Sequence, residues 1–133
     1  FRSMRIALYL ISLSLFFAAC KKDNAKETDV PAVITLNAPI AGTIILNGTS
    51  LQIRGNATDD NVLASINCTV RNTNTNAVLY SRTLTTGNVG FFDFSQDWNV
   101  TGIVGLVSAR LTVTTTDKVG YAATKTVDFQ LTD

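Results

Sequence analysis

Apolar and polar side chains alternate with a period of two through most of the chain after residue 30. Successive side chains of a β-strand point to opposite faces of a sheet, so this period is typical of half-buried strands. Turn residues separate the alternating runs, and no run keeps the helical period over three turns. The pattern therefore predicts an all-β fold, an antiparallel β-sandwich of about seven or eight strands.

The alternation also predicts which side chains face the core. One run carries its large residues on even positions, and Phe91 has the opposite phase. If the Phe91 ring is exposed, it marks a contact surface. The strands are expected at 33–36, 44–46, 51–58, 63–72, 77–85, 92–100, 106–116 and 121–131. The expected inward residues include Leu51, Ile53, Gly55, Ala57, Ala64, Ile66, Cys68, Val70, Phe92, Phe94, Trp98, Val100, Ala109, Leu111, Val113, Ala123, Val127, Phe129 and Leu131.

The first 19 residues follow a different pattern. Arg2 and Arg5 precede an uncharged, mostly apolar run, residues 6–19. A membrane-spanning helix needs about 20 apolar residues, so this run has the length of a signal-peptide core instead. We therefore expect a signal peptide over residues 1–19. An ordinary signal peptide ending in Ala-x-Ala, with Cys20 incidental, and an uncleaved membrane anchor are the alternatives.

The end of this run, Phe17-Ala18-Ala19-Cys20, resembles a lipobox, the processing site of bacterial lipoproteins. The resemblance implies that Cys20 receives a diacylglyceryl thioether and becomes the new N-terminus. Phe17 departs from the leucine that the family more often has. The following residues resemble the start of mature lipoproteins from Bacteroidetes, which implies a cell-envelope protein of the outer membrane, facing either side.

Residues 20–29 are expected to form the lipidated cysteine and a short disordered tether, because Lys21–Asp29 has no periodic apolar pattern. Fully extended, nine residues reach about 30 Å. The β-sandwich domain is then expected over residues 30–133, held close to a membrane.

Three segments of this domain resemble turns of bacterial immunoglobulin-like and cadherin-like modules. They are 36–42, which is similar to a P-x-x-G entry, 55–61, similar to G-x-A-x-D-D, and 113–120, similar to V-x-A-x-D-x-x-G-N. Tyr121 stands where the last motif has Asn. The resemblance implies an immunoglobulin-like sandwich of the kind that small Bacteroidetes lipoproteins of unknown function carry.

Charge and composition exclude some functions. Without Arg2 and Arg5 the chain has nine Lys and Arg against ten Asp and Glu, a net charge of about −1. The basic residues of the domain occur singly along the sequence, so no nucleic-acid-binding face is expected. The chain has no histidine, which excludes histidine-dependent catalysis or metal binding.

The acidic turns are candidates for calcium. Asp59, Asp60 and Asn61 lie in one loop and Asp117 in another, and an immunoglobulin-like topology brings both loops to one pole. Ca²⁺ takes six to eight oxygen ligands, which such side chains and nearby carbonyls supply. The alternative is ordinary turn chemistry, in which Asp and Asn bind their own backbone.

The other candidates point to a binding protein. Cys68 is unpaired once Cys20 is acylated, and its phase predicts a buried thiol. Asp93 and Asp97 share one strand face, but no phosphate loop or nucleophile motif accompanies them. The expected function is therefore a non-enzymatic binding or interaction domain, with either a protein partner or, as the alternative, a carbohydrate ligand in glycan uptake.

Overall fold

A computed structural model of the chain describes residues 30–133, so the predicted signal peptide, the acylation site at Cys20 and the tether lie outside the described residues. Six strands follow one another, and within this part of the chain no helix has the length and apolarity to cross a membrane. The strands are β1 (Val33–Ala38), β2 (Ile44–Leu46), β3 (Ser50–Asn72), β4 (Val78–Asn99), β5 (Val107–Asp117) and β6 (Ala122–Thr132).

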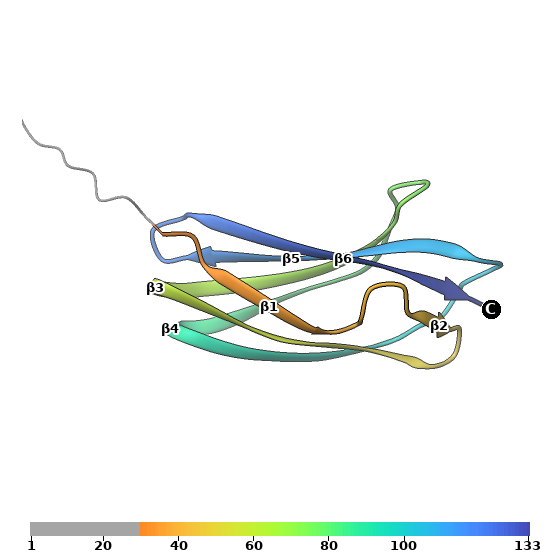
Figure 1. Cartoon of the computed structure of the whole chain (residues 1–133), viewed down its shortest axis with the longest axis horizontal. Coiled ribbons are helices and arrows are strands. Elements are labelled where there is room, and N and C mark those ends of the chain that lie inside the picture. The colour runs from red at the N-terminus through yellow and green to blue at the C-terminus, as the bar shows by residue number, and fades with distance from the viewer. Residues whose placement is uncertain (1–29) are drawn as a thin grey trace, which may run out of the picture.

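Two long strands, β3 and β4, build both layers of the sandwich (Figure 1). Their pairing is interrupted between Thr58 and Leu63, and both strands bend there. The first half of β3 pairs with β1 and with the second half of β4. These three segments form the smaller layer. The second half of β3 pairs with β5 and with the first half of β4, and β6 and β2 extend this second, larger layer. Counting the halves separately gives eight strand segments, which confirms the predicted all-β sandwich.

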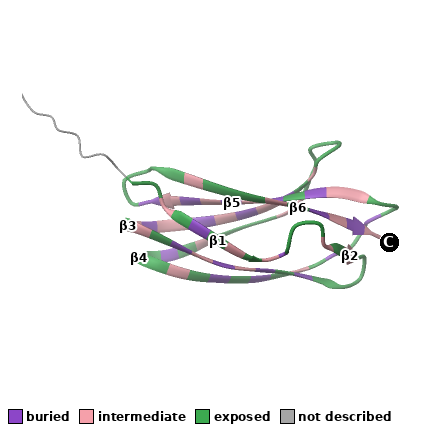
Figure 2. Ribbon diagram, in the orientation of Figure 1, coloured by how far each residue is buried: buried purple, intermediate pink, exposed green. Residues whose placement is uncertain are grey.

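The core lies between the layers, and the alternating pattern identified most of it correctly. Purple buried positions recur along the strands in Figure 2. Each fully buried aliphatic or aromatic side chain contributes about 1.5–3 kcal/mol relative to an exposed one. The buried apolar residues are Ile34, Leu51, Ile53, Ala57, Leu63, Ile66, Cys68, Val70, Phe94, Val100, Ile103, Ala109, Leu111, Val113, Phe129 and Leu131.

The bends are where sequence-based expectation and structure differ. Residues 59–61 and 87–90, expected to end strands, lie within the continuous strands β3 and β4. A register shift between Leu63 and Ser65 changes the phase, so Leu63 is buried where Ala64 was expected inward. Such a slip by one residue moves side chains to the opposite face.

Gly55 allows β1 and the second half of β4 to pack closely against β3 in the smaller layer. It lies opposite Phe94 in the β3–β4 pair. A Cβ atom at this position would collide with the carbonyl oxygen of Thr35 and would lie 2.6 Å from Cζ of the Phe94 ring. Because the first of these atoms belongs to the backbone of a paired strand, it has little freedom to move aside.

Gly55→Ala is therefore expected to lower the free energy of unfolding by about 1–3 kcal/mol, the usual cost of overpacking. Urea denaturation followed by circular dichroism measures this loss. Gly90→Ala is the matched control, since the nearest atom to its Cβ is a carbonyl oxygen 3.4 Å away. Equal stabilities of the two variants would contradict the packing argument.

Candidate functional site

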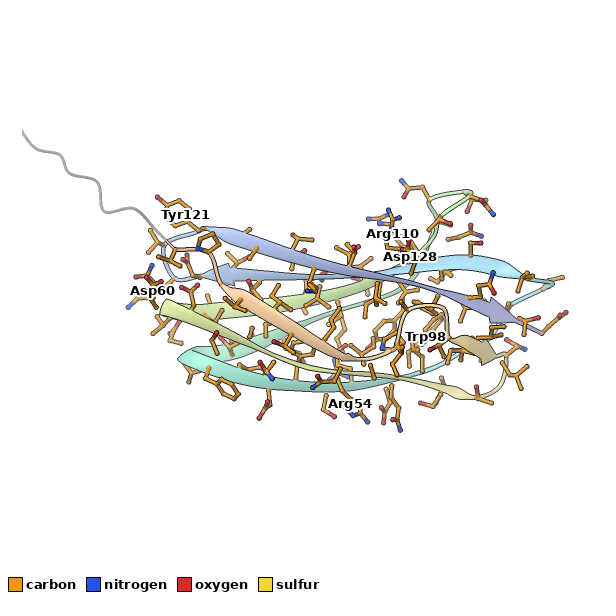
Figure 3. The ribbon with its side chains drawn as sticks, viewed as in Figure 1. Arg54, Asp60, Trp98, Arg110, Tyr121 and Asp128 are labelled. Carbon is orange, nitrogen blue, oxygen red and sulfur yellow. The ribbon has the colours of Figure 1, made fainter. Side chains whose placement is uncertain are left out.

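One pole of the sandwich combines the chain entry with the acidic turns. The chain enters the domain at Val30, beside the β5–β6 turn and the bend of β3 (Figure 1). The backbone N–H of Lys118 donates to the carbonyl of Val62 at 2.8 Å, which joins the turn to the bend. Asp60 and Tyr121 both lie at this pole in Figure 3.

Asp117 organises the β5–β6 turn. Its Oδ1 accepts hydrogen bonds from the backbone N–H groups of Val119, Gly120 and Tyr121 at 2.9, 2.8 and 2.9 Å. Gly120 has a φ of 105°, a backbone conformation that residues other than glycine rarely adopt. The D-x-x-G motif is thus explained by the backbone bonds of the turn.

The acidic residues at the bend of β3 use their carboxylates in the same way. The backbone N–H of Asn61 donates to Oδ1 of Asp59 at 3.0 Å and to Oδ1 of Asp60 at 2.9 Å. Burial raises the pKa of Asp59, and the nearby charges of Asp117 and Asp60 raise it further. The bend of β3 and the β5–β6 turn are therefore close enough for their carboxylates to repel one another.

These contacts favour the turn-chemistry interpretation of the acidic residues. Residues 30–133 contain no group of three or more His, Cys, Asp or Glu side chains that could hold a metal ion. The Oδ1 atoms of Asp59, Asp60 and Asp117 all accept backbone N–H groups. Calcium binding by Asp59, Asp60, Asn61 and Asp117 stays a prediction, tested by whether calcium raises the melting temperature.

The aromatic side chains divide between surface and core. Phe91 is 52% exposed, on the outer face of the smaller layer near the chain entry. Phe94 is buried, and Trp98 is half-buried and stacked on Tyr80 with ring centroids 5.5 Å apart. The Tyr80 hydroxyl donates to Oε1 of Gln96 at 2.9 Å. Trp98 therefore packs within the protein, and Phe91 is the exposed ring of this strand.

Two of the candidate reactive groups, Asp97 and Cys68, have structural roles. Asp97 forms an ion pair with Arg54, whose guanidinium lies 2.8 Å from the carboxylate and also donates to the Gln96 carbonyl. Asp93 takes no part in that pair. Burial raises the pKa of the Cys68 thiol to about 11, and its side chain is fully buried. A thiol with such a pKa is a poor nucleophile at neutral pH.

Sequence reasoning missed a polar surface that we call the hydroxyl face, on the outer side of the larger layer. Residues directly opposite one another in antiparallel strands point to the same side, so the register defines its rows. Asn67 Nδ2 donates to the Thr83 hydroxyl at 2.9 Å, and the Thr69 and Ser81 hydroxyls lie 3.0 Å apart. The hydroxyl face comprises Ser65, Asn67, Thr69, Ser81, Thr83, Thr85, Thr112, Thr114, Thr116, Thr124 and Thr126.

A polar hollow lies at one end of the hydroxyl face. It has a volume of about 230 Å³ and is lined by Arg71, Thr73, Asn76, Arg110 and Thr112. Arg71 of β3 lies directly opposite Arg110 of β5. Basic residues that stand singly along the sequence are thus paired here in space, because strand pairing joins two that are distant in sequence.

The end of the domain opposite the chain entry exposes apolar side chains. The backbone N–H of Gly48 donates to the Val100 carbonyl at 2.8 Å, so the turn after β2 lies beside the loop before β5. We call this region the distal apolar surface. Its exposed residues are Ile44, Leu46, Val104 and Leu106.

The layers and strand order define an immunoglobulin-like β-sandwich, which known structures also support. No protein-family model and no curated protein sequence matches the chain. Among solved structures, a fibronectin(III)-like module of Clostridium thermocellum CbhA is similar, with a TM-score of 0.52 and 14% sequence identity. The match covers 75% of this chain and 96% of the module. At this identity the likeness shows the fold.

Asp59→Asn is expected to raise the melting temperature at pH 7. Since the folded state raises the pKa of Asp59, the charged carboxylate destabilises it, and Asn keeps the Oδ1 acceptor. The gain is absent below pH 3.8, the ordinary pKa of an aspartate side chain, and develops as the pH rises from there through the folded-state pKa. Melting curves from about pH 3 to 8 measure it, with Asp93→Asn as the control. A stabilisation independent of pH would contradict the electrostatic explanation.

Cys68 is expected to resist thiol reagents in the native protein. Its burial and raised pKa leave little accessible thiolate at about pH 7.5. Labelling with an aromatic disulfide reagent, with and without denaturing urea, measures the effect. Rapid labelling of the native thiol, at the rate of the unfolded chain, would contradict the buried placement.

Proposed function

We propose that this chain is a membrane-anchored lipoprotein whose β-sandwich is a non-enzymatic binding module. Two features of the chain support this proposal. The lipobox-like segment that ends at Cys20 predicts acylation, and the described domain begins at Val30, on one pole of the sandwich. A tether of nine residues keeps the domain within about 30 Å of the acylated cysteine. An outer-membrane location follows from the resemblance to lipoproteins of Bacteroidetes.

The exposure of the distal apolar surface is the main support for a binding role. Leu46 is 53% exposed, Leu106 is 64% exposed and Val104 is 83% exposed. Contiguous exposed apolar side chains on a soluble domain mark sites of protein interaction. With the anchor at the opposite pole, this surface points away from the membrane. A protein partner is therefore the favoured ligand class.

The exposed side chains at the pole nearest the tether support this orientation of the domain relative to the membrane. Phe91, Val33, Val119 and Tyr121 are all about half exposed or more at that pole. Aromatic side chains with an apolar body are favoured at the level of lipid head groups. In the proposed arrangement Phe91 lies on the side of the domain that faces the membrane, so it contacts lipid head groups instead of a soluble ligand.

A second candidate function is carbohydrate binding, in an accessory protein of glycan uptake. The hydroxyl face favours it, since its eleven residues carry hydroxyl or amide groups and no formal charge. Such groups match the hydrogen-bonding pattern of sugars. Retention on insoluble polysaccharides separates the two candidates, because a protein-binding module passes through without delay.

Cys20→Ser is expected to abolish fatty acylation and to move the protein from the membrane fraction to the soluble fraction. Two or three acyl chains give stable attachment, and their loss removes it. Expression with the natural leader in a Gram-negative host, followed by fractionation and mass spectrometry, tests this. An intact leader in the unaltered protein, or identical fractionation of both, would contradict the anchoring proposal.

Leu46→Asp, combined with Leu106→Asp, is expected to abolish complex formation by the anchored protein while leaving its melting temperature within a few degrees. Both side chains are exposed, so their replacement costs little folding energy. In-cell crosslinking measures the complexes, and Val78→Asp, at an exposed position on β4, is the control. Unchanged crosslinks in the double variant would contradict the assignment of the distal apolar surface as the binding site.

A further inference from the structure

Two arginine residues line the hollow at the end of the hydroxyl face. Arg71 lies on β3 and Arg110 lies directly opposite on β5. Like charges in direct cross-strand pairs destabilise a sheet. Asp128 offsets part of this repulsion through its ion pair with Arg110, and a bound anion would offset the rest.

The two arginines differ in how their charge is balanced. Arg110 makes a bidentate pair with Asp128, with distances of 2.7 and 3.1 Å, and this contact lowers the pKa of that carboxyl (Figure 3). Arg71 donates to the carbonyl oxygen of Asn76 at 3.2 Å. Within residues 30–133, no carboxylate lies within ion-pair distance of Arg71. The site thus carries about one net positive charge.

The hollow around the arginines is built in advance by the β3–β4 hairpin. The Asn72 side-chain oxygen accepts the backbone N–H groups of Asn74 and Thr75, at 2.8 and 3.2 Å. The hydroxyl of Thr73 donates to the carbonyl of Ser108 at 3.2 Å, which ties the hairpin to β5. A site that is formed before binding loses less conformational entropy when a ligand arrives.

We infer that this hollow binds the carboxylate or sulfate group of an acidic glycan whose chain lies along the hydroxyl face. The inference deepens the carbohydrate-binding candidate and rests on it. Planar guanidinium groups recognise such anions through paired N–H donors. The neighbouring side chains of the hollow, Thr73 and Thr112, carry hydroxyl groups that bind the hydroxyls of the same sugar.

A glycan fits this surface better than a peptide does. The rows beside the hollow contain mainly Thr, Ser and Asn, and Val78, opposite Arg71, is the large apolar side chain exposed there, so they offer little apolar surface to peptide side chains. They also have no aromatic ring on which a neutral sugar would stack. Recognition must then depend on hydrogen bonds and charge, which selects an acidic sugar over a neutral one.

The experiment titrates the intact acylated chain, in detergent, with three hexasaccharides. They are an oligogalacturonate, a heparin-derived fragment and cellohexaose, and calorimetry measures the dissociation constants at low and high salt. We expect the acidic ligands to bind at least about tenfold more tightly than cellohexaose, with a preference that weakens in salt. The comparison of the first two distinguishes a carboxylate from a sulfate.

Arg71→Gln is expected to weaken binding of the preferred acidic ligand about tenfold, since one charge-assisted donor pair is lost. Arg82→Gln is the matched control, because it removes the same charge from an exposed position on β4 outside the hollow. Its dissociation constant should stay within about twofold. Equal losses in both variants would show attraction by net charge alone and would overturn the inference.

Asp128→Asn supplies a test that does not depend on loss of function. It removes the carboxylate that neutralises Arg110, so the acidic ligand should bind several-fold more tightly. Unchanged affinity in both Arg71→Gln and Asp128→Asn overturns the inference even if cellohexaose binds, in which case carbohydrate binding itself survives. Binding of an acidic peptide in the hollow, with no binding of any glycan, overturns both.

Discussion

The pairing of β3 with β4 is the constraint on which the rest of the molecule depends. Both strands pass through both layers, so a single antiparallel ladder joins them, and the interruption between Thr58 and Leu63 is where the sheet folds over. Close packing of Gly55 against Phe94 stabilises the smaller layer beside this bend. The β5–β6 turn then attaches to the bend through Val62, which assembles the pole where the chain enters.

The same ladder separates three surfaces of different chemistry. The pole near Val30 has exposed aromatic and aliphatic residues, the opposite end has the distal apolar surface, and the flank of the larger layer has the hydroxyl face. If the domain is tethered near Val30 as proposed, the other two surfaces face its surroundings. The proposed anchor would then compete with neither surface for space.

Much of the core was predictable because one buried face imposes a period of two on each strand. Leu111, Val113 and Leu131 are buried as that period requires. The prediction failed at Ala64, where a register shift changed the phase, and at residues 59–61 and 87–90, where strands bend instead of ending. Asp and Gly residues lower the cost of both a bend and a turn, so their presence does not distinguish the two.

The sequence by itself determined the all-β class, most of the buried residues and the backbone role open to Asp117, because local alternation and turn chemistry need only neighbouring residues. It also carries the whole case for the lipid anchor at Cys20, which lies outside the described part of the chain. Only the tertiary structure placed Arg71 opposite Arg110 and aligned the threonines of β5 with the polar residues of three other strands. Strand register is a property of pairs of distant segments, so single-residue patterns along the chain do not contain it.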